Sequence, residues 1–223
     1  MITIGLTGGI GCGKSTVASL LEVYGMAVYS ADEESKRLLE MPNPNPNRVL
    51  NPVRVGTTVR IEDAHRHSLI RKQLTTLLGD SIYDSNGLNR KLMASLIFND
   101  ANLLEQVNAI IHPEVGCHFQ SWLEQQTTKY AVLESAILFE SKFDRYVNFC
   151  LTVYAPHELR IQRVMMRDGI TEAEVGQRMQ HQMPEEENMK RADFVIYNDG
   201  IQPLIPQIEE LVKISLKNNR QKS

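Results

Sequence analysis

A glycine-rich stretch at the start of the chain constrains its fold more than any other feature. Residues 8–16 read Gly-Gly-Ile-Gly-Cys-Gly-Lys-Ser-Thr and fit G-x-x-x-x-G-K-[ST] at every fixed position. The glycines let the backbone curl so that successive N–H groups point at one cluster of phosphate oxygens. A β-rich segment, Ile2–Thr7, precedes the stretch and a helical pattern follows it. This context favours a phosphate-binding loop over a glycine turn that binds nothing.

The motif gives its polar residues distinct roles. Lys14 is expected to reach the β- and γ-phosphates of ATP, and the Ser15 hydroxyl is expected to ligate Mg²⁺. The helix that follows directs its positive N-terminal end at the same anion. We therefore expect the ATP-binding groups at Gly9, Gly11, Cys12, Gly13, Lys14, Ser15 and Thr16.

The cysteines form no recognised pattern. Cys12, Cys117 and Cys150 are widely spaced and contain no CxxC pair, so neither a disulfide framework nor a zinc site is indicated. Cys12 lies inside the predicted loop, close to the N-terminus of the following helix, where the pKa of a thiol is often lowered. Cys12 is thus either a redox-sensitive thiol or a small side chain that the loop tolerates.

Length and charge narrow the class of protein. A chain of 223 residues suits one α/β domain better than two independent cores. The net charge of −3 gives no strong field toward nucleic acid or an anionic membrane. The N-terminus lacks the pattern of a signal peptide, and no run approaches the roughly 18 apolar residues of a membrane span. We expect a cytoplasmic monomer that binds neither nucleic acid nor membrane.

The order of the elements favours a sandwich of helices around a sheet. Strands separated by helices imply a parallel sheet that is covered on both faces. We predict a three-layer α/β/α P-loop NTPase fold with one five-stranded parallel sheet. Its strands are predicted at Ile2–Thr7, Met26–Tyr29, Tyr130–Leu133, Phe149–Tyr154 and Phe194–Tyr197.

We read residues 1–223 as a single P-loop kinase domain. The core is assigned to residues 1–40, 127–167 and 193–218, a helical acceptor-binding part to residues 72–126, and a lid to residues 168–192. Residues 42–70 form an atypical insertion, because their Pro-Asn repeat cannot continue a helix. Within it, residues 53–61 alternate like a hairpin, and His65 and His67 form a His-x-His pair without an obvious third metal ligand.

Two features point to a small kinase among P-loop proteins. A GTPase would need Asn-Lys-x-Asp and an acidic strand end followed by x-x-Gly, and neither is present. Small P-loop kinases place an acceptor-activating carboxylate after the second strand and a basic lid late in the chain. Asp32 follows the second strand, at the sheet edge where doubly wound folds bind ligands. Its alternative role is to cap the helix Ala31–Glu40.

Further charged residues fit the same chemistry. Glu134 ends a central strand, where it would hold Mg²⁺ through water or only order the following loop. Arg160, Arg163 and Arg167 recur every three to four residues on one helix face. Such a face is usually just solvated. A phosphoryl-transfer transition state, however, spreads negative charge over three oxygens that arginines stabilise, so Arg163 and Arg167 are catalytic candidates.

Several separate motifs, taken in order, carry a family resemblance. They are Ile4–Ile10 leading into Gly13–Thr16, Ser30-Ala31-Asp32, His112-Pro113, Leu133–Glu140, Arg163 with Arg167-Asp168, Arg191-Ala192-Asp193 and Asn198-Asp199-Gly200. Together they resemble the dephospho-CoA kinases from residue 2 to about residue 217. The resemblance implies that ATP phosphorylates the ribose 3′-hydroxyl of dephospho-CoA, giving CoA and ADP in the last step of coenzyme A biosynthesis.

The resemblance also implies site residues. Asp32 matches the second, catalytic acid of the family motif, and Lys36 falls where the family commonly has arginine. His112 would help to bind the acceptor, and Asn198 would lie at the nucleotide. Glu134 replaces the strand-end aspartate of the family. Whether Glu134 would bind the substrate or Mg²⁺ therefore stays open. The substrates would be ATP and dephospho-CoA.

Two rival functions remain at this stage. One is another small-molecule P-loop kinase of the nucleotide or shikimate type, which would not bring the His112-Pro113 and Glu134–Glu140 motifs with it. The other is a nucleotide-binding switch without turnover, against which Asp32 and the lid arginines argue.

Overall fold

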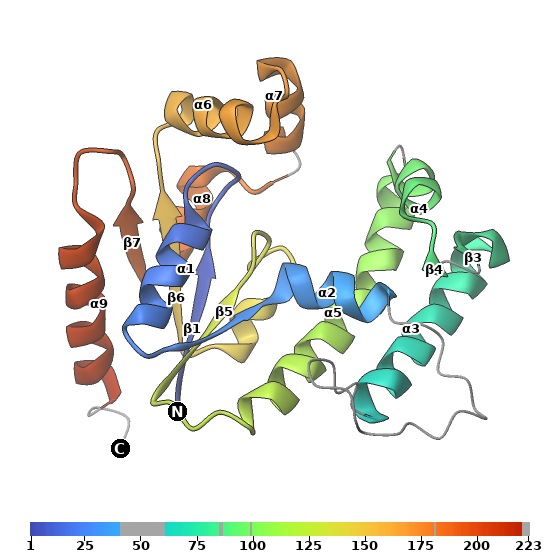
Figure 1. The fold of residues 1–223 in the computed structure, drawn as a ribbon, viewed down its shortest axis with the longest axis horizontal. Coiled ribbons are helices and arrows are strands. Elements are labelled where there is room, and N and C mark those ends of the chain that lie inside the picture. Colours follow the sequence, from blue (N-terminus) through green and yellow to red (C-terminus); the bar gives the residue numbers. More distant parts are fainter. Residues whose placement is uncertain (41–60, 85–86, 99, 181, 220–223) are drawn as a thin grey trace. The chain divides into compact units, whose positions relative to one another are not determined.

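The predicted sheet is present in the computed structural model, which describes residues 1–40, 61–84, 87–98, 100–180 and 182–219 (Figure 1). Five strands pair in the order β2-β5-β1-β6-β7, and every pairing is parallel. The α/β fold with a five-stranded parallel sheet is therefore confirmed. The strands are β1 (Ile2–Thr7), β2 (Ala27–Ser30), β5 (Tyr130–Glu134), β6 (Phe149–Tyr154) and β7 (Phe194–Tyr197).

The chain divides into two compact units. The first consists of Met1–Asp32 and Trp122–Ser223 and contains the sheet. The second consists of Glu33–Ser121 and is mainly helical.

The main core of the first unit lies against its sheet. The helices of this unit are α1 (Lys14–Val23), α6 (His157–Asp168), α7 (Glu172–Gln180), α8 (Glu185–Arg191) and α9 (Leu204–Asn219). β1 and β6 are buried at five of their six positions each, as expected of strands that are covered on both faces. Their side chains pack with those of α1 and α9 in one buried cluster that includes Ile4, Leu6, Val17, Leu21, Leu151, Val153, Ile196, Ile208 and Leu211.

The second unit combines helices with a small hairpin. Its elements are most of α2 (Ala31–Glu40), α3 (Ile61–Leu78), η1 (Asp80–Ile82), β3 (Tyr83–Asp84), β4 (Gly87–Leu88), α4 (Arg90–Ile97) and nearly all of α5 (Ala101–Leu123). Strands β3 and β4 pair antiparallel. Within the described residues, no helix has the length and apolar character needed to cross a membrane.

A polar network lies inside the second unit. Arg37 of α2 donates to Glu34 at 2.5 Å and to Asp63 of α3 at 3.2 Å. The Nε2 atom of His118, on α5, lies 2.9 Å from the Arg37 guanidinium and 3.2 Å from Asp63 Oδ1. Asp63 and His118 are buried whereas Arg37 and Glu34 are partly exposed, so the network ties three helices together from the interior of the unit to its surface.

Helix α3 departs from the expected course of the chain. The hairpin expected at residues 53–61 lies outside the described residues except for Ile61, which begins α3. His65 is exposed and His67 is fully buried, so the two histidines of the His-x-His pair face different surroundings. Among the described residues, no group of three His, Cys, Asp or Glu side chains could hold a metal ion.

Candidate active site

The glycine-rich loop joins β1 to α1 in a conformation that requires glycine. Gly11 has φ 81° and Gly13 has φ 90°, in the left-handed region that residues with a Cβ rarely adopt. A Cβ added to Gly13 would also collide with the side-chain amide of Asn198. The loop is thus shaped both by its own glycines and by β7, which Asn198 directly follows.

Two side chains hold carbonyl groups of the loop. Arg160 Nε donates to the carbonyl of Ile10 at 2.9 Å, and Asn198 Nδ2 donates to the carbonyl of Cys12 at 2.8 Å. In a planar trans peptide the N–H points opposite to the C=O. The amides of Gly11 and Gly13 therefore point away from these two side chains, and they donate to no other group in the part of the chain described. They are available to an anion.

Lys14 lies between two carboxylates at the carboxyl edge of the sheet. Its Nζ is 3.1 Å from Glu134 Oε1 and 3.6 Å from Asp32 Oδ2. The register of the sheet explains this meeting, because Glu134 on β5 pairs with Leu6 on β1 and with Ser30 on β2. Lys14 and Glu134 are only 14% and 13% exposed, so their attraction is less screened than that of a surface pair.

The alternative that Asp32 caps α2 does not fit its contacts. Asp32 lies inside the helix, which begins at Ala31, and its carboxylate accepts from the backbone N–H of Ala136 at 3.3 Å. Its side chain is 40% exposed and remains accessible. Asp32 therefore presents a carboxylate beside Lys14.

The structure opposes a reactive thiol at Cys12. The side chain is 1% exposed and belongs to the main core. Burial raises the pKa of this thiol and outweighs the lowering effects of the Lys14 amide and of the nearby cations. Ser15 and Thr16, by contrast, lie exposed on the first turn of α1.

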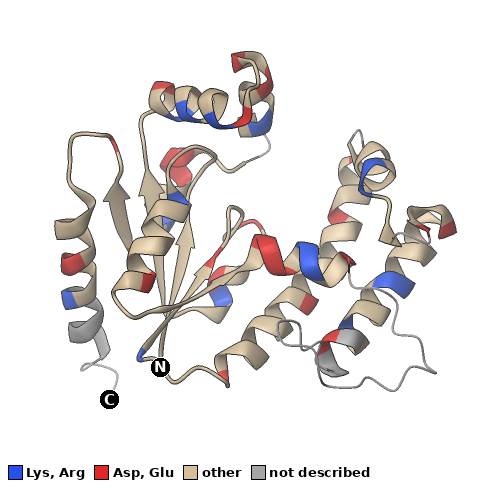
Figure 2. Ribbon diagram, viewed as in Figure 1, with Lys and Arg blue, Asp and Glu red and all other residues tan. Residues whose placement is uncertain are grey.

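Basic residues recur along α6 (Figure 2), and its three arginines have different surroundings. Arg163 reaches the loop, with Nη1 3.5 Å from the carbonyl of Gly11 and Nη2 3.5 Å from Asn198 Oδ1. Arg167 is exposed and pairs with its neighbour Asp168 at 2.7 Å, a hydrogen bond that raises the pKa of the guanidinium. The structure thus brings Arg163 to the phosphate loop and leaves Arg167 away from it.

Arg160 contacts the loop more closely than the sequence indicates. Besides the carbonyl of Ile10, it pairs with Glu185 at the start of α8, and its guanidinium lies against Gly9. Gln182 accepts from the N–H of Ile10 at 2.7 Å. The helical spacing of the α6 arginines was the only signal for Arg160, and nothing in the sequence marked Gln182 or Glu185.

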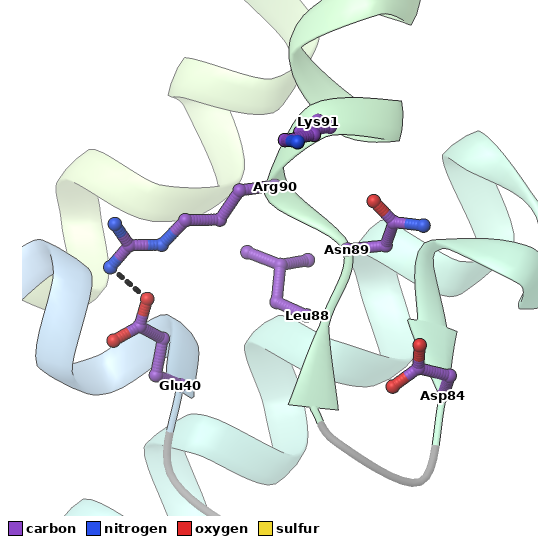
Figure 3. Close-up of a pocket in the computed structure, with 6 residues that line it drawn as sticks. All are labelled: Glu40, Asp84, Leu88, Asn89, Arg90 and Lys91. Carbon is purple, nitrogen blue, oxygen red and sulfur yellow. Dashed lines mark ion pairs between the residues drawn. The ribbon is translucent and has the colours of Figure 1, made fainter.

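The two site residues expected from the acceptor side lie in the second unit. Lys36 is exposed on α2, and His112 is half-buried on α5, directly before Pro113 inside that helix. The same unit contains a polar pocket of about 520 Å³ that neither residue lines (Figure 3). Arg90 forms an ion pair with Glu40 across it. The lining residues are Glu40, Asp84, Leu88, Asn89, Arg90 and Lys91.

The matching family model and the curated relatives name one family. The family model described as dephospho-CoA kinase matches residues 2–52 and 57–203. The dephospho-CoA kinase of Bacteroides fragilis is 42% identical over 212 residues, which cover 95% of this chain and 91% of that protein. The dephospho-CoA kinase of Porphyromonas gingivalis is 36% identical over 215 residues, covering 96% and 94%. The crystal structure of TT1252 from Thermus thermophilus superposes with a TM-score of 0.72 at 31% identity, covering 97% of each chain.

Proposed function

The chain belongs to the dephospho-CoA kinase family, and on that premise we propose that it transfers the γ-phosphoryl group of ATP to the ribose 3′-hydroxyl of dephospho-CoA. The products are CoA and ADP, and the reaction is the last step of coenzyme A biosynthesis. The observation that carries the proposal is the position of Lys14, which follows a phosphate loop and lies within 4 Å of Asp32 and Glu134.

ATP binds to the loop through backbone and side chain together. The amides of Gly11 and Gly13 donate to phosphate oxygens, helped by the positive end of α1. When ATP binds, the Lys14 ammonium moves partly away from Asp32 and Glu134 and neutralises charge on the β- and γ-phosphates. Asn198 and Arg163 support the outer side of the loop, as their contacts with Cys12, Gly11 and each other indicate.

Asp32 accepts the proton of the acceptor hydroxyl. The ribose oxygen forms a bond to the γ-phosphorus, the bond from that phosphorus to the bridging oxygen breaks, and ADP leaves. The accessible carboxylate of Asp32, 3.6 Å from the lysine expected at the γ-phosphate, supports this role. Arg163 and Arg167 stabilise the negative charge that develops on the transferred group. Arg167 can do so only by leaving Asp168.

Mg²⁺ fits the donors at this edge of the sheet. Two carboxylates beside one lysine leave an excess negative charge, which a cation would balance. Mg²⁺ usually takes only one or two protein oxygens and completes its shell with phosphates and water. The Ser15 hydroxyl and the Glu134 carboxylate would hold it. When bound, it would neutralise charge on the β- and γ-phosphates.

The remaining assignments concern the acceptor and the surroundings of the protein. Lys36 and His112 bind the acceptor, residues 72–126 form its binding part, and residues 168–192 act as a lid over the nucleotide. The insertion at about 42–70 takes no part in the chemistry. The small net charge of −3 supports a protein without nucleic-acid or membrane partners. We keep the expectation of a cytoplasmic monomer.

The test is the identity of the product. Incubation with ATP, Mg²⁺ and dephospho-CoA should yield equal amounts of ADP and CoA, and ³¹P NMR should show a new phosphomonoester on the ribose 3′-oxygen. Lys14→Ala should form neither product while the protein still folds, because the Lys14 side chain is not part of the buried apolar cluster. Near-normal activity in folded Lys14→Ala, or a phosphate at another position, would contradict the proposal.

A further inference from the structure

Arg160 is held differently from the other arginines of α6. It is 7% exposed, and its guanidinium packs so closely on the loop that a Cβ on Gly9 would collide with it. Its Nε donates to the carbonyl of Ile10 and its Nη1 pairs with Glu185. One side chain thus connects the phosphate loop to the first residue of α8.

The backbone of Ile10 is held on both sides. Gln182 accepts from its N–H at 2.7 Å, and Arg160 donates to its carbonyl at 2.9 Å. Because the peptide that joins Ile10 to Gly11 is planar and trans, fixing this carbonyl also fixes the direction of the Gly11 amide. Gly11 itself imposes little, since glycine adopts positive and negative φ about equally well. The contacts around Ile10 therefore select the orientation of a phosphate-binding amide.

The ion pair of Arg160 and Glu185 is not explained by stability alone. Both side chains are largely buried, at 9% and 15% exposure, and Glu185 Oε1 has no hydrogen-bond partner among the residues described. Burying two charges costs desolvation that their attraction often fails to offset. The ion pair is better explained by its effect on the phosphate loop, because it holds the Arg160 guanidinium against the backbone of Gly9 and Ile10.

We propose that Arg160 is a positioning residue for ATP binding that acts through the Ile10 peptide. Gln182 and Glu185 make the orientation of that peptide depend on the segment that leads into α8. While residues 182–185 stay in place, the Gly11 amide faces the nucleotide phosphates. When the segment moves away, Arg160 loses its carboxylate partner and the Ile10–Gly11 peptide is free to rotate. The inference rests on the proposed function only in that the loop must bind ATP.

The test is the ATP affinity of three variants, measured by isothermal titration calorimetry below their melting transitions. Arg160→Gln should weaken ATP binding by about tenfold, the usual scale for losing a charged hydrogen bond. Glu185→Gln and Gln182→Ala should weaken it in the same direction by smaller factors. The affinity for dephospho-CoA should not change in any of them. Arg145→Gln is the matched control, since Arg145 is exposed and bonds the Tyr146 hydroxyl.

Two results would overturn the proposal. A lower melting temperature with unchanged ATP affinity would make the cluster purely structural, and tighter ATP binding would make it a latch that competes with the nucleotide. If Arg160→Gln does not fold, Glu185→Gln and Gln182→Ala decide by the same criteria. Because the readout is nucleotide binding, a wild type that fails to phosphorylate dephospho-CoA would reject the proposed function and leave this test intact.

Discussion

Asp32 is the residue on which the proposed chemistry depends most. If it accepts the proton of the acceptor hydroxyl, Asp32→Asn should lower kcat by roughly 10²–10⁴-fold, about 3–5 kcal/mol of barrier. ATP affinity should hold or rise slightly, because the substitution removes a negative charge 3.6 Å from the Lys14 ammonium. Single-turnover transfer and a nucleotide titration on the same variant separate the two effects.

Glu134→Gln is the matched comparison for Asp32→Asn. It also removes one negative charge beside Lys14, but its main expected effect is a higher Mg²⁺ concentration for half-maximal activity. A wild-type rate in Asp32→Asn, together with a large loss of kcat at saturating Mg²⁺ in Glu134→Gln, would transfer the role of proton acceptor to Glu134.

The thiols give a second prediction at the scale of single residues. Cys117 is exposed, whereas Cys12 and Cys150 are buried, and burial raises the pKa of Cys150 to about 12. Iodoacetamide at pH 8 should therefore modify Cys117 first and leave Cys12 and Cys150 largely intact in the native protein. Peptide mass spectrometry over a time course measures this order. Labelling of Cys12 as fast as Cys117 would revive a redox role for the loop.

At the scale of single elements, α3 contains a histidine that should make stability depend on pH. His67 is fully buried, and neither ring nitrogen has a hydrogen-bond partner among the described residues. Burial, and to a lesser degree Arg71, lowers the pKa of His67. The unfolded chain takes up a proton near pH 6.5 while the folded chain does not. Stability should be complete above that pH and fall as the pH drops toward the lower folded pKa.

Thermal melts at pH 7.5 and 5.5 test the role of His67. His67→Leu should be at least as stable as the wild type at pH 7.5, because it removes two unsatisfied polar atoms from the interior. Between pH 7.5 and 5.5, the melting temperature of His67→Leu should also fall by less than that of the wild type. His65→Leu, which changes the exposed histidine of the same helix, should keep the acid sensitivity of the wild type. Equal acid-induced losses in His67→Leu and the wild type would show that His67 is not the titrating group.

The strands were more predictable than the helices of the second unit. β1, β6 and β7 begin and end at their predicted residues, because each is a short run rich in β-forming residues that is bounded by loops or turns. The start of α3 was not predicted, because the Pro-Asn repeat suggested an irregular segment and the alternation up to Ile61 suggested a hairpin. The placement of α3 in its unit also depends on the contacts of Asp63 with Arg37 and His118, two residues that are distant in sequence.

Some residues of the candidate site could be predicted from sequence motifs, whereas others are brought to the site only by the fold. Lys14 and Asp32 were predictable, since one belongs to the phosphate-loop pattern and the other follows a strand at the ligand-binding edge. Their proximity to Glu134 follows from parallel register. The contacts that hold the Ile10 backbone were not predictable. Arg160 and Gln182 lie about 150 to 170 positions further along the chain and belong to no local pattern that marks them. The same is true of Glu185, which pairs with Arg160.

At the scale of the whole molecule, the family match spans both units. The model for dephospho-CoA kinases covers the phosphate loop, Asp32 and Glu134 in the first unit, and Lys36 and His112 in the second. Lys36 and His112, which we assign to the acceptor, both lie in the second unit. The second unit therefore has its proposed role in selecting the acceptor.

The most direct measurement of the central claim is kcat/KM for four acceptors, dephospho-CoA, AMP, adenosine and shikimate, in one coupled ADP-release assay. Each rate is corrected for ATP hydrolysis without acceptor, and Lys14→Ala provides the background. We predict that dephospho-CoA exceeds each of the other three by well over tenfold. A tenfold preference for a nucleotide or for shikimate would contradict the assignment and identify a different small-molecule kinase.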